Sequence, residues 1–219
     1  MQQAFRPPVP EAVVIDGPAG ALEARAENPL PDAAVQVVGI VCHPHPLYGG
    51  TMQNKVVHTL ARAMQELGAP TLRFNFRGAG ASAGVHAEGV GEIDDALAAI
   101  AWARRRWNCE RLWLAGFSFG AAVALQAAPR ASAERLVTVA PPVARLGLEK
   151  SPPRPDAAWL IVQGDADELV DAAEVARWAA AYSPPPELAV LAGAEHFFHG
   201  RLGDLRETVM HFLGGAEPG

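Results

Sequence analysis

Short apolar runs alternate with amphipathic stretches along most of this chain. Six of the runs are strand candidates, and the first of them is near-continuous, which is typical of a β-strand covered on both faces. They are Val35–Cys42, Thr71–Phe76, Leu112–Ala115, Leu136–Val139, Trp159–Val162 and Leu188–Leu191. Runs of this kind favour a mostly parallel sheet, because a parallel sheet is buried on both sides.

The stretches between these strands repeat apolar residues at helical spacing. The stretch that ends at Gly68 carries one such face, made of Val56, Leu60, Met64 and Leu67. A helix expected over Glu92–Trp107 carries another, made of Ile93, Leu97, Ile100 and Trp107. Further helices are expected over Ala121–Ala128, over Asp171–Tyr182 and along the final stripe of Leu202, Leu205, Val209 and Phe212. Alternating strands and helices predict right-handed crossovers with helices on both faces of the sheet.

The beginning of the chain follows a different pattern. Two short strand candidates, Glu11–Ile15 and Leu22–Ala26, are separated by glycine, proline and aspartate residues that favour a tight turn. They predict an antiparallel hairpin at one edge of the sheet. The whole chain, residues 1–219, is therefore interpreted as a single α/β domain.

Composition narrows the class of protein. The chain has 219 residues, half of them hydrophobic, and a net charge of −6, so it can bury a sizeable core and shows no basic footprint for nucleic acid or an anionic membrane. Its two cysteines, Cys42 and Cys109, do not suggest a disulfide framework. The proline-containing start, Met1–Pro10, does not resemble a signal peptide, and no apolar segment is long enough to span a membrane. A cytoplasmic location is expected.

One stretch carries the clearest chemistry. Gly116, Ser118 and Gly120 form a G-x-S-x-G pattern between an apolar strand and an alanine-rich helix. This is the pattern of a nucleophile elbow, in which a tight strand-to-helix turn holds a serine hydroxyl above the edge of a sheet. Glycine is expected on both sides, because a Cβ there would collide with the other element of the turn.

A nucleophilic serine needs a base, and the base needs an acid that orients it. Asp165 and Asp167 both follow the strand that ends near Val162, and His196 follows the next strand. The order of serine, acid and histidine, each after its own strand, is that of the α/β-hydrolase triad. On the residues alone either aspartate can be the acid, and either can instead bond to its own turn.

With these motifs in place, the chain resembles the α/β-hydrolase superfamily, and more closely its small lidless, dienelactone-hydrolase-like members. The resemblance covers nearly the whole chain and rests on five motifs: 43–52 (HPHPLYGGTM), 73–82 (RFNFRGAGAS), the elbow, Gly164–Val170, and His196 with Phe197. It implies an α/β-hydrolase fold with a mostly parallel central sheet, helices on both faces and no lid domain. Its G-x-x-D-x-x-V spacing selects Asp167 as the acid.

The resemblance also implies the mechanism and further site residues. Ser118 would attack an ester carbonyl, His196 would accept its proton, and Asp167 would orient the histidine. The backbone N–H of Phe119 is the first expected oxyanion donor. The second is expected in the loop after Val35–Cys42, where Pro44 and Pro46 have no N–H. We therefore expect His45 to supply it, with Leu47 or Tyr48 as alternatives.

Several other side chains of these loops have two interpretations. His43, Tyr48 and His199 are predicted to line the substrate pocket, with loop anchoring as the alternative for His43, a plain loop position for Tyr48 and the start of the last helix for His199. The remaining histidines, His58, His86 and His211, are interpreted as ordinary helix or loop residues.

The proline-rich link Ala140–Asp156 leaves little room for a lid, which predicts an open site for small esters. The expected activity is therefore a serine hydrolase that cleaves small carboxylic esters or thioesters, without a cofactor or a metal. Alternatives are a serine peptidase, a noncatalytic binding protein with this fold, and a metal-dependent hydrolase built on the histidines, although no metal-ligand spacing supports the last. A homodimer is compatible with an open apolar site, but nothing in the sequence requires one.

Overall fold

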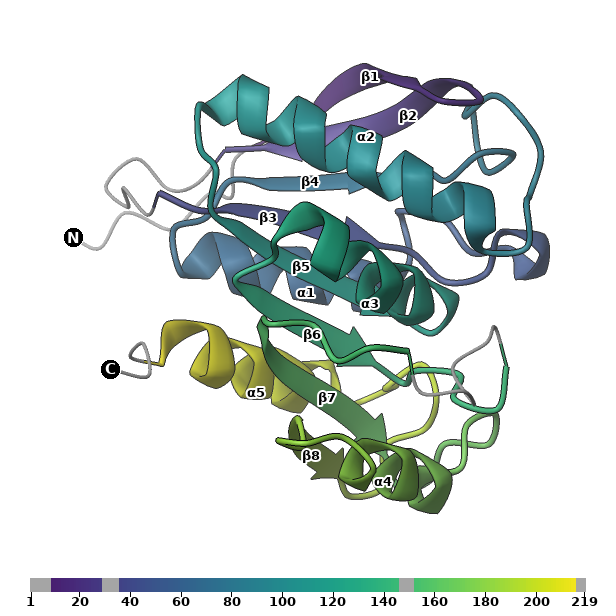
Figure 1. Cartoon of the computed structure of the whole chain (residues 1–219), viewed down its shortest axis with the longest axis vertical. Helices are drawn as coiled ribbons and strands as arrows, with labels where there is room; N and C mark the ends of the chain where they lie inside the picture. Colours follow the sequence, from purple (N-terminus) through teal and green to yellow (C-terminus); the bar gives the residue numbers. More distant parts are fainter. Residues whose placement is uncertain (1–8, 29–35, 146–151, 216–219) are drawn as a thin grey trace.

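A central eight-stranded sheet organises the molecule (Figure 1). The computed structural model describes residues 9–28, 36–145 and 152–215. Its strands are β1 Glu11–Gly17, β2 Gly20–Glu27, β3 Val38–Cys42, β4 Thr71–Phe74, β5 Leu112–Phe117, β6 Arg135–Val139, β7 Ala158–Gly164 and β8 Glu187–Leu191. Their spatial order is β1-β2-β4-β3-β5-β6-β7-β8, and the six strands from β4 to β8 are parallel.

The first two strands form the antiparallel edge that the sequence predicts. β1 pairs with β2 in a register that ends at the Gly17–Gly20 turn, and β2 pairs antiparallel with β4. The prediction of a mostly parallel sheet with an N-terminal antiparallel hairpin is therefore confirmed. Val35, where one strand was expected to begin, lies outside the described residues.

Helices cover both faces of the sheet. They are the 3-10 turn η1 Pro46–Tyr48 and the α-helices α1 Lys55–Glu66, α2 Val90–Trp107, α3 Phe119–Ala131, α4 Ala172–Ala180 and α5 Leu202–Gly214. In Figure 1, α2, α3 and α4 lie in front of the sheet, and α1 and α5 lie behind it. Alternate residues of the central strands enter the two cores: Ile40 and Leu114 pack on the side of α2 and α3, and Val41 and Ala115 on the side of α1.

The buried face of α2 differs from the predicted one. Its fully buried apolar residues are Ala96, Ala99, Ile100 and Ala103, whereas Ile93, Leu97 and Trp107 are only partly buried at its margins. The reason is the neighbouring helix, since α3 is itself rich in alanine. Small side chains on both helices let the two backbones approach closely, so alanine occupies the contact and the larger residues are displaced from it.

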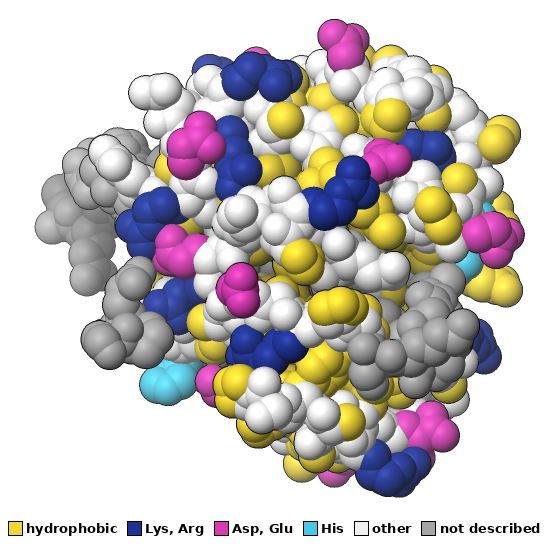
Figure 2. All heavy atoms as spheres, in the orientation of Figure 1, with side chains coloured by type: hydrophobic (Ala, Val, Ile, Leu, Met, Phe, Trp, Pro, Cys, Tyr) yellow, Lys and Arg dark blue, Asp and Glu magenta, His cyan; other side chains and the backbone are white. Residues whose placement is uncertain are grey.

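The carboxyl ends of the parallel strands share one edge of the sheet, and the loops that leave it hold all the residues considered next. On the face shown in Figure 2, lysine and arginine side chains are interspersed with acidic ones. In the link between β6 and β7, residues 140–145 and 152–157 form no helix or strand.

Candidate active site

Ser118 stands on a strained turn between β5 and α3. Its φ of 53° and ψ of −119° are unusual for a residue with a side chain. Such a conformation costs about 1–3 kcal/mol and is kept mainly at functional sites. The Ser118 N–H donates to the carbonyl of Val139 at the end of β6, over 2.8 Å. The turn therefore fixes Ser118 at the carboxyl edge of the sheet.

Two glycines permit this turn in different ways. A Cβ on Gly116 would overlap the backbone of Gly120, where strand and helix meet, so the predicted collision is confirmed there. A Cβ on Gly120 would instead overlap the carbonyl groups of Cys42 and His43, at the end of β3. The prediction is wrong for Gly120 because its close neighbour is an adjacent strand, not β5. Gly120 thereby lets the loop after β3 approach the nucleophile.

The structure brings Ser118, His196 and Asp167 together in series. His196 Nε2 lies 3.2 Å from Ser118 Oγ, and His196 Nδ1 lies 2.8 Å from Asp167 Oδ2. With the imidazole proton on Nδ1, donated to Asp167, Nε2 is free to accept the serine hydroxyl proton. The side chains of His196 and Asp167 are 4% and 0% exposed, so water does not compete for the bond between them.

Asp167 is held by the start of its own loop. Its Oδ1 accepts the backbone N–H groups of Leu169 and Val170, both over 2.8 Å. Burial alone would raise the pKa of this carboxyl, but the hydrogen bonds from His196, Leu169 and Val170, with the charge of His196, outweigh burial and hold the pKa below its ordinary value. Asp167 is thus an oriented carboxylate.

Asp165, the other candidate acid, serves a different purpose. Its exposed carboxylate accepts the N–H of Gly193 over 2.6 Å, which ties the loop after β7 to the loop after β8. This is a turn-stabilising contact, and only Asp167 of the two reaches His196.

Gln163 is a member of this site that the sequence interpretation missed. It is fully buried, and its Nε2 donates to Asp167 Oδ2 over 3.0 Å and to the carbonyl of Val170 over 3.1 Å. The residue therefore supports both the carboxylate and the loop that holds it. Its position directly before Gly164 and the aspartates is the only signal that the sequence offers.

Two residues of the pocket lining have backbone N–H groups that are candidates for an oxyanion hole. Phe119 is the first residue of α3, so its N–H has no carbonyl partner within the helix and lies at the positive end of the helix dipole. His45 lies between two prolines on the loop after β3, and both residues line the pocket that contains Ser118. Among the described residues, neither N–H donates a hydrogen bond. Two donors in this setting suit a developing oxyanion.

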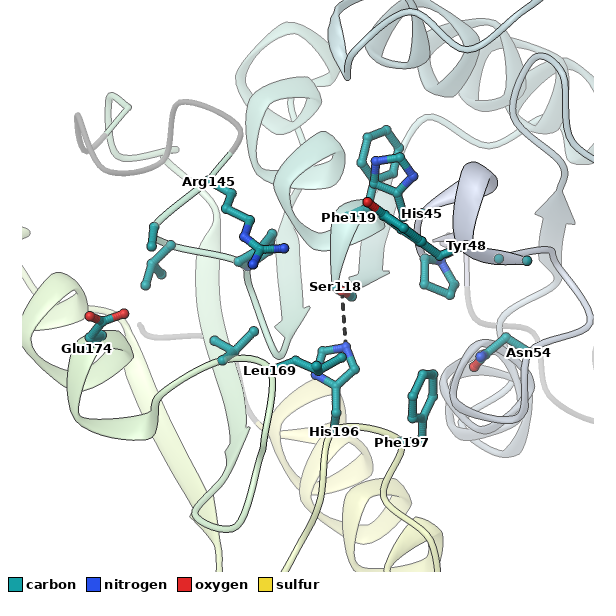
Figure 3. A pocket seen from close by; sticks show the side chains of 17 residues that line it. His45, Tyr48, Asn54, Ser118, Phe119, Arg145, Leu169, Glu174, His196 and Phe197 are labelled. Carbon is teal, nitrogen blue, oxygen red and sulfur yellow. Dashed lines mark hydrogen bonds between the residues drawn. The ribbon is translucent and has the colours of Figure 1, made fainter.

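An open pocket of about 360 Å³ surrounds the nucleophile (Figure 3). In Figure 3, His196 and Phe197 rise from the loop after β8, and His45 and Tyr48 lie across the pocket from Leu169. Tyr48 is 84% exposed and Leu169 is 61% exposed, so the mouth of the pocket is rimmed by apolar side chains in contact with solvent. The predicted pocket position of Tyr48 agrees with this arrangement.

Two residues predicted to line the pocket do not reach it. His43 is fully buried beneath the loop, where its Nε2 accepts the N–H of Phe76 and its Nδ1 lies 2.6 Å from the Pro44 carbonyl oxygen. It anchors the loop, as the alternative interpretation held. His199 is exposed and pairs with Glu195 over 3.3 Å, away from the pocket. The prediction is wrong for His43 because its bond to Phe76 holds the ring beneath the loop, and it is wrong for His199 because that side chain turns to Glu195 at the surface.

Neither a metal centre nor a membrane helix is found in the described part of the chain. No three histidine, cysteine or acidic side chains come together there as metal ligands would. Nor does any helix within it combine the length and the apolar character needed to cross a membrane.

Known proteins resemble this chain in sequence and fold. The model of a family described as serine aminopeptidase, S33, matches residues 39–152. An uncharacterized protein of Rickettsia prowazekii is 33% identical over 92% of this chain and 87% of its own length. An α/β serine hydrolase without a lid from Xanthomonas campestris is 43% identical, with a TM-score of 0.89 over 99% of this chain and 100% of that one. An α/β serine hydrolase homologue from Coxiella burnetii is 46% identical, with a TM-score of 0.89 over 96% and 100% of the two chains.

More distant structures share the fold alone. An esterase of Pyrococcus furiosus is 21% identical, with a TM-score of 0.78 over 94% of this chain and 92% of that one. The prediction of a lidless α/β-hydrolase fold is confirmed by its likeness to the Xanthomonas structure.

Proposed function

Because the chain belongs to the serine aminopeptidase S33 family and is a homologue of α/β serine hydrolases, we propose that it hydrolyses small carboxylic esters or thioesters through an acyl-enzyme on Ser118. The observation that carries this proposal is the unbroken series of hydrogen bonds from Ser118 Oγ through His196 to Asp167. A scaffold protein would have no need of a strained serine aligned with a buried histidine and carboxylate.

The reaction follows from these positions. His196 Nε2 takes the hydroxyl proton while Ser118 Oγ bonds to the carbonyl carbon, and the N–H groups of Phe119 and His45 receive the oxyanion. The tetrahedral intermediate collapses, the bond to the leaving group breaks, and His196 gives its proton to the departing oxygen or sulfur. Water, deprotonated by the same Nε2, then attacks the acyl carbon. The acid is released and Ser118 recovers its proton.

The pocket supports esters over peptides. An aminopeptidase must hold the ammonium group of its substrate, and Glu174 is a carboxylate in the pocket lining that could do so. Arg145 also lines the pocket, however, and its positive charge offsets that of Glu174. A pocket without a net negative charge favours a neutral ester over a cationic peptide terminus. The small open volume further supports short acyl groups, in line with the esterase activity named for distant proteins of this fold.

The decisive experiment combines labelling with a substrate panel. A fluorophosphonate probe should label the wild-type protein and should fail to label Ser118→Ala. Short p-nitrophenyl esters should be hydrolysed far faster than aminoacyl p-nitroanilides or emulsified long-chain lipids. Faster hydrolysis of the anilides would support the peptidase, and an unlabelled wild-type protein without turnover would support a binding role.

A further inference from the structure

Three rings from three separate segments of the chain meet beside the proposed oxyanion hole. His45 comes from the loop after β3, Phe119 from the start of α3, and His86 from the loop between β4 and α2. The ring centroids of His45 and Phe119 are 4.8 Å apart. The His86 ring lies 4.7 Å from His45 and 5.5 Å from Phe119, tilted to both. These distances are those of packed aromatic rings.

His86 is buried beside an acidic residue of α2. Its Nδ1 lies 2.9 Å from Glu92 Oε1, and the two side chains are 7% and 0% exposed. The Glu92 carboxylate also accepts the N–H groups of Ala87 and Gly89, over 2.8 Å and 2.9 Å, which fixes the loop that carries His86 to the beginning of the helix. The His86 ring is therefore confined by its burial and by the close approach of Glu92, whose carboxylate lies at ion-pair distance from Nδ1 without the geometry of a hydrogen bond.

The His45 and Phe119 rings touch each other, and β3 pairs with β5 as far as Cys42 and Gly116, but among the described residues no hydrogen bond joins the two donor residues directly. The His45 N–H lies on a loop closed by the 3-10 turn η1, and its ring Nδ1 accepts the N–H of Leu47 over 3.3 Å. The Phe119 N–H belongs to α3. Beyond the strand pairing that ends at Cys42 and Gly116, the separation of the two N–H groups depends on how the His45 and Phe119 side chains pack, and His86 packs against both.

We propose that His86 is a positioning residue for the oxyanion hole, clamping the His45 loop against Phe119 so that both backbone N–H groups meet the same oxygen. This inference rests on the proposed hydrolase function. It assigns His86 no contact with the substrate, in keeping with its absence from the pocket lining. Oxyanion donors act mainly on the transition state, so a displaced donor lowers kcat with little change in KM.

The test compares His86→Ala with His86→Phe, which keeps a ring of similar size but cannot pair with Glu92. His58→Ala, on α1 outside the pocket, is the control for a histidine lost elsewhere. With a short p-nitrophenyl ester, His86→Ala should lose on the order of tenfold in kcat while KM stays within about twofold. His86→Phe should recover most of that loss, and His58→Ala should match the wild type.

A second readout isolates the oxyanion hole from general loosening. A short alkyl trifluoromethyl ketone adds to Ser118 Oγ, and its carbonyl oxygen becomes an oxyanion held by the two N–H groups. Its affinity for His86→Ala should fall by the same factor as kcat. The inference is overturned if His86→Ala keeps the wild-type kcat and ketone affinity, or if only KM rises. If His86→Ala does not fold, His86→Leu replaces it, with the same outcomes. A wild-type protein without fluorophosphonate labelling or ester turnover would instead overturn the proposed function.

Discussion

The backbone N–H of Phe76 donates to Nε2 of His43 over 2.9 Å, which joins the ends of the neighbouring strands β4 and β3 beneath the active-site loop. Because Nε2 accepts this bond, the ring is neutral and its proton sits on Nδ1, facing the Pro44 carbonyl. Burial lowers the pKa of His43 to about 4, from an ordinary value of 6.5. A proton on Nε2 would point the imidazole N–H at the backbone N–H of Phe76, leaving two donors with no acceptor between them.

This bond predicts acid sensitivity of the fold. Below pH 6.5 the unfolded chain takes up a proton that folded His43 does not accept until about pH 4. The free energy of unfolding is therefore highest above pH 6.5 and decreases as the pH falls from 6.5 toward 4. Between neutral pH and pH 5 the decrease should be about 2 kcal/mol. Urea unfolding of the wild type and of His43→Gln at both pH values measures the difference. An unchanged pH dependence in His43→Gln would contradict the assignment.

Asp167→Asn should abolish most activity while Asp165→Asn should not. In Asp167→Asn the amide oxygen keeps the bonds from the Leu169 and Val170 N–H groups, which turns the NH₂ toward His196 Nδ1. The imidazole is then forced into the wrong tautomer, and kcat should fall by about 10⁴-fold. Asp165→Asn loses only part of a turn contact with Gly193 and should stay within about tenfold of the wild type. Steady-state kinetics on one ester compares the two, and similar losses would mean that the acid is misassigned.

Gln163→Glu should destabilise the fold more than Gln163→Met. The Gln163 amide donates to Asp167 and to the carbonyls of Gly164 and Val170, so a carboxylate there would face only acceptors. A buried charge without a partner should lower the free energy of unfolding by about 3 kcal/mol or more. Gln163→Met removes the donors without adding charge and should cost less. Chemical denaturation near neutral pH decides this, and equal stability of the two variants would be the contrary result.

Gly120→Ala should damage both folding and activity. The new Cβ would overlap the carbonyls of Cys42 and His43, which are backbone atoms and cannot rotate aside. We expect a loss of about 2 kcal/mol in the free energy of unfolding, with reduced labelling of Ser118. Gly203→Ala is the control, since a Cβ at that position in α5 meets no atom within 4 Å, and it should leave stability unchanged or slightly raised. Calorimetry measures the melting temperatures. If both variants had the melting temperature of the wild type, the close approach of Gly120 to Cys42 and His43 would be contradicted.

Arg145 and Glu174 should give opposite responses to charged substrates. Among the described residues that line the pocket, Arg145 is the basic side chain and Glu174 is the acidic one, and the lining contains no other lysine, arginine, aspartate or glutamate. Arg145→Ala should raise KM for a p-nitrophenyl ester with a free carboxylate by about threefold at low salt, with little change for a neutral ester of similar size. Glu174→Ala should lower the same KM. The shifts should shrink in high salt, and shifts of equal sign would exclude an electrostatic cause.

The central strands, the hairpin and the order of the site residues could be predicted because each rests on local pattern. A buried parallel strand is apolar throughout, and a strand-to-helix turn around Ser118 requires glycine nearby. The identity of the catalytic acid was harder to predict from the sequence, because Asp165 and Asp167 are only two residues apart. What distinguishes Asp167 is that its carboxylate accepts the N–H groups of Leu169 and Val170, and the positions of these groups depend on how the loop folds.

Contacts between distant segments could not be predicted. The partner of His43 is Phe76, just past the end of β4, and the ring partners of His86 are His45, on the loop after β3, and Phe119, at the start of α3. The alanine face of α2 is fixed by the alanines of α3. In each case a residue is surrounded by side chains from a distant part of the sequence, and the residue pattern of its own segment does not predict them.

A hydrolase without a lid contacts only the part of a substrate that enters its pocket. We therefore expect the parts of a substrate that extend past Tyr48 and Leu169 to remain in water, and the same acyl group to be hydrolysed at a similar rate whether it is attached to a polymer or to a small alcohol. Turnover would not wait on a moving flap, and the catalytic rate should be limited by chemistry rather than by gating.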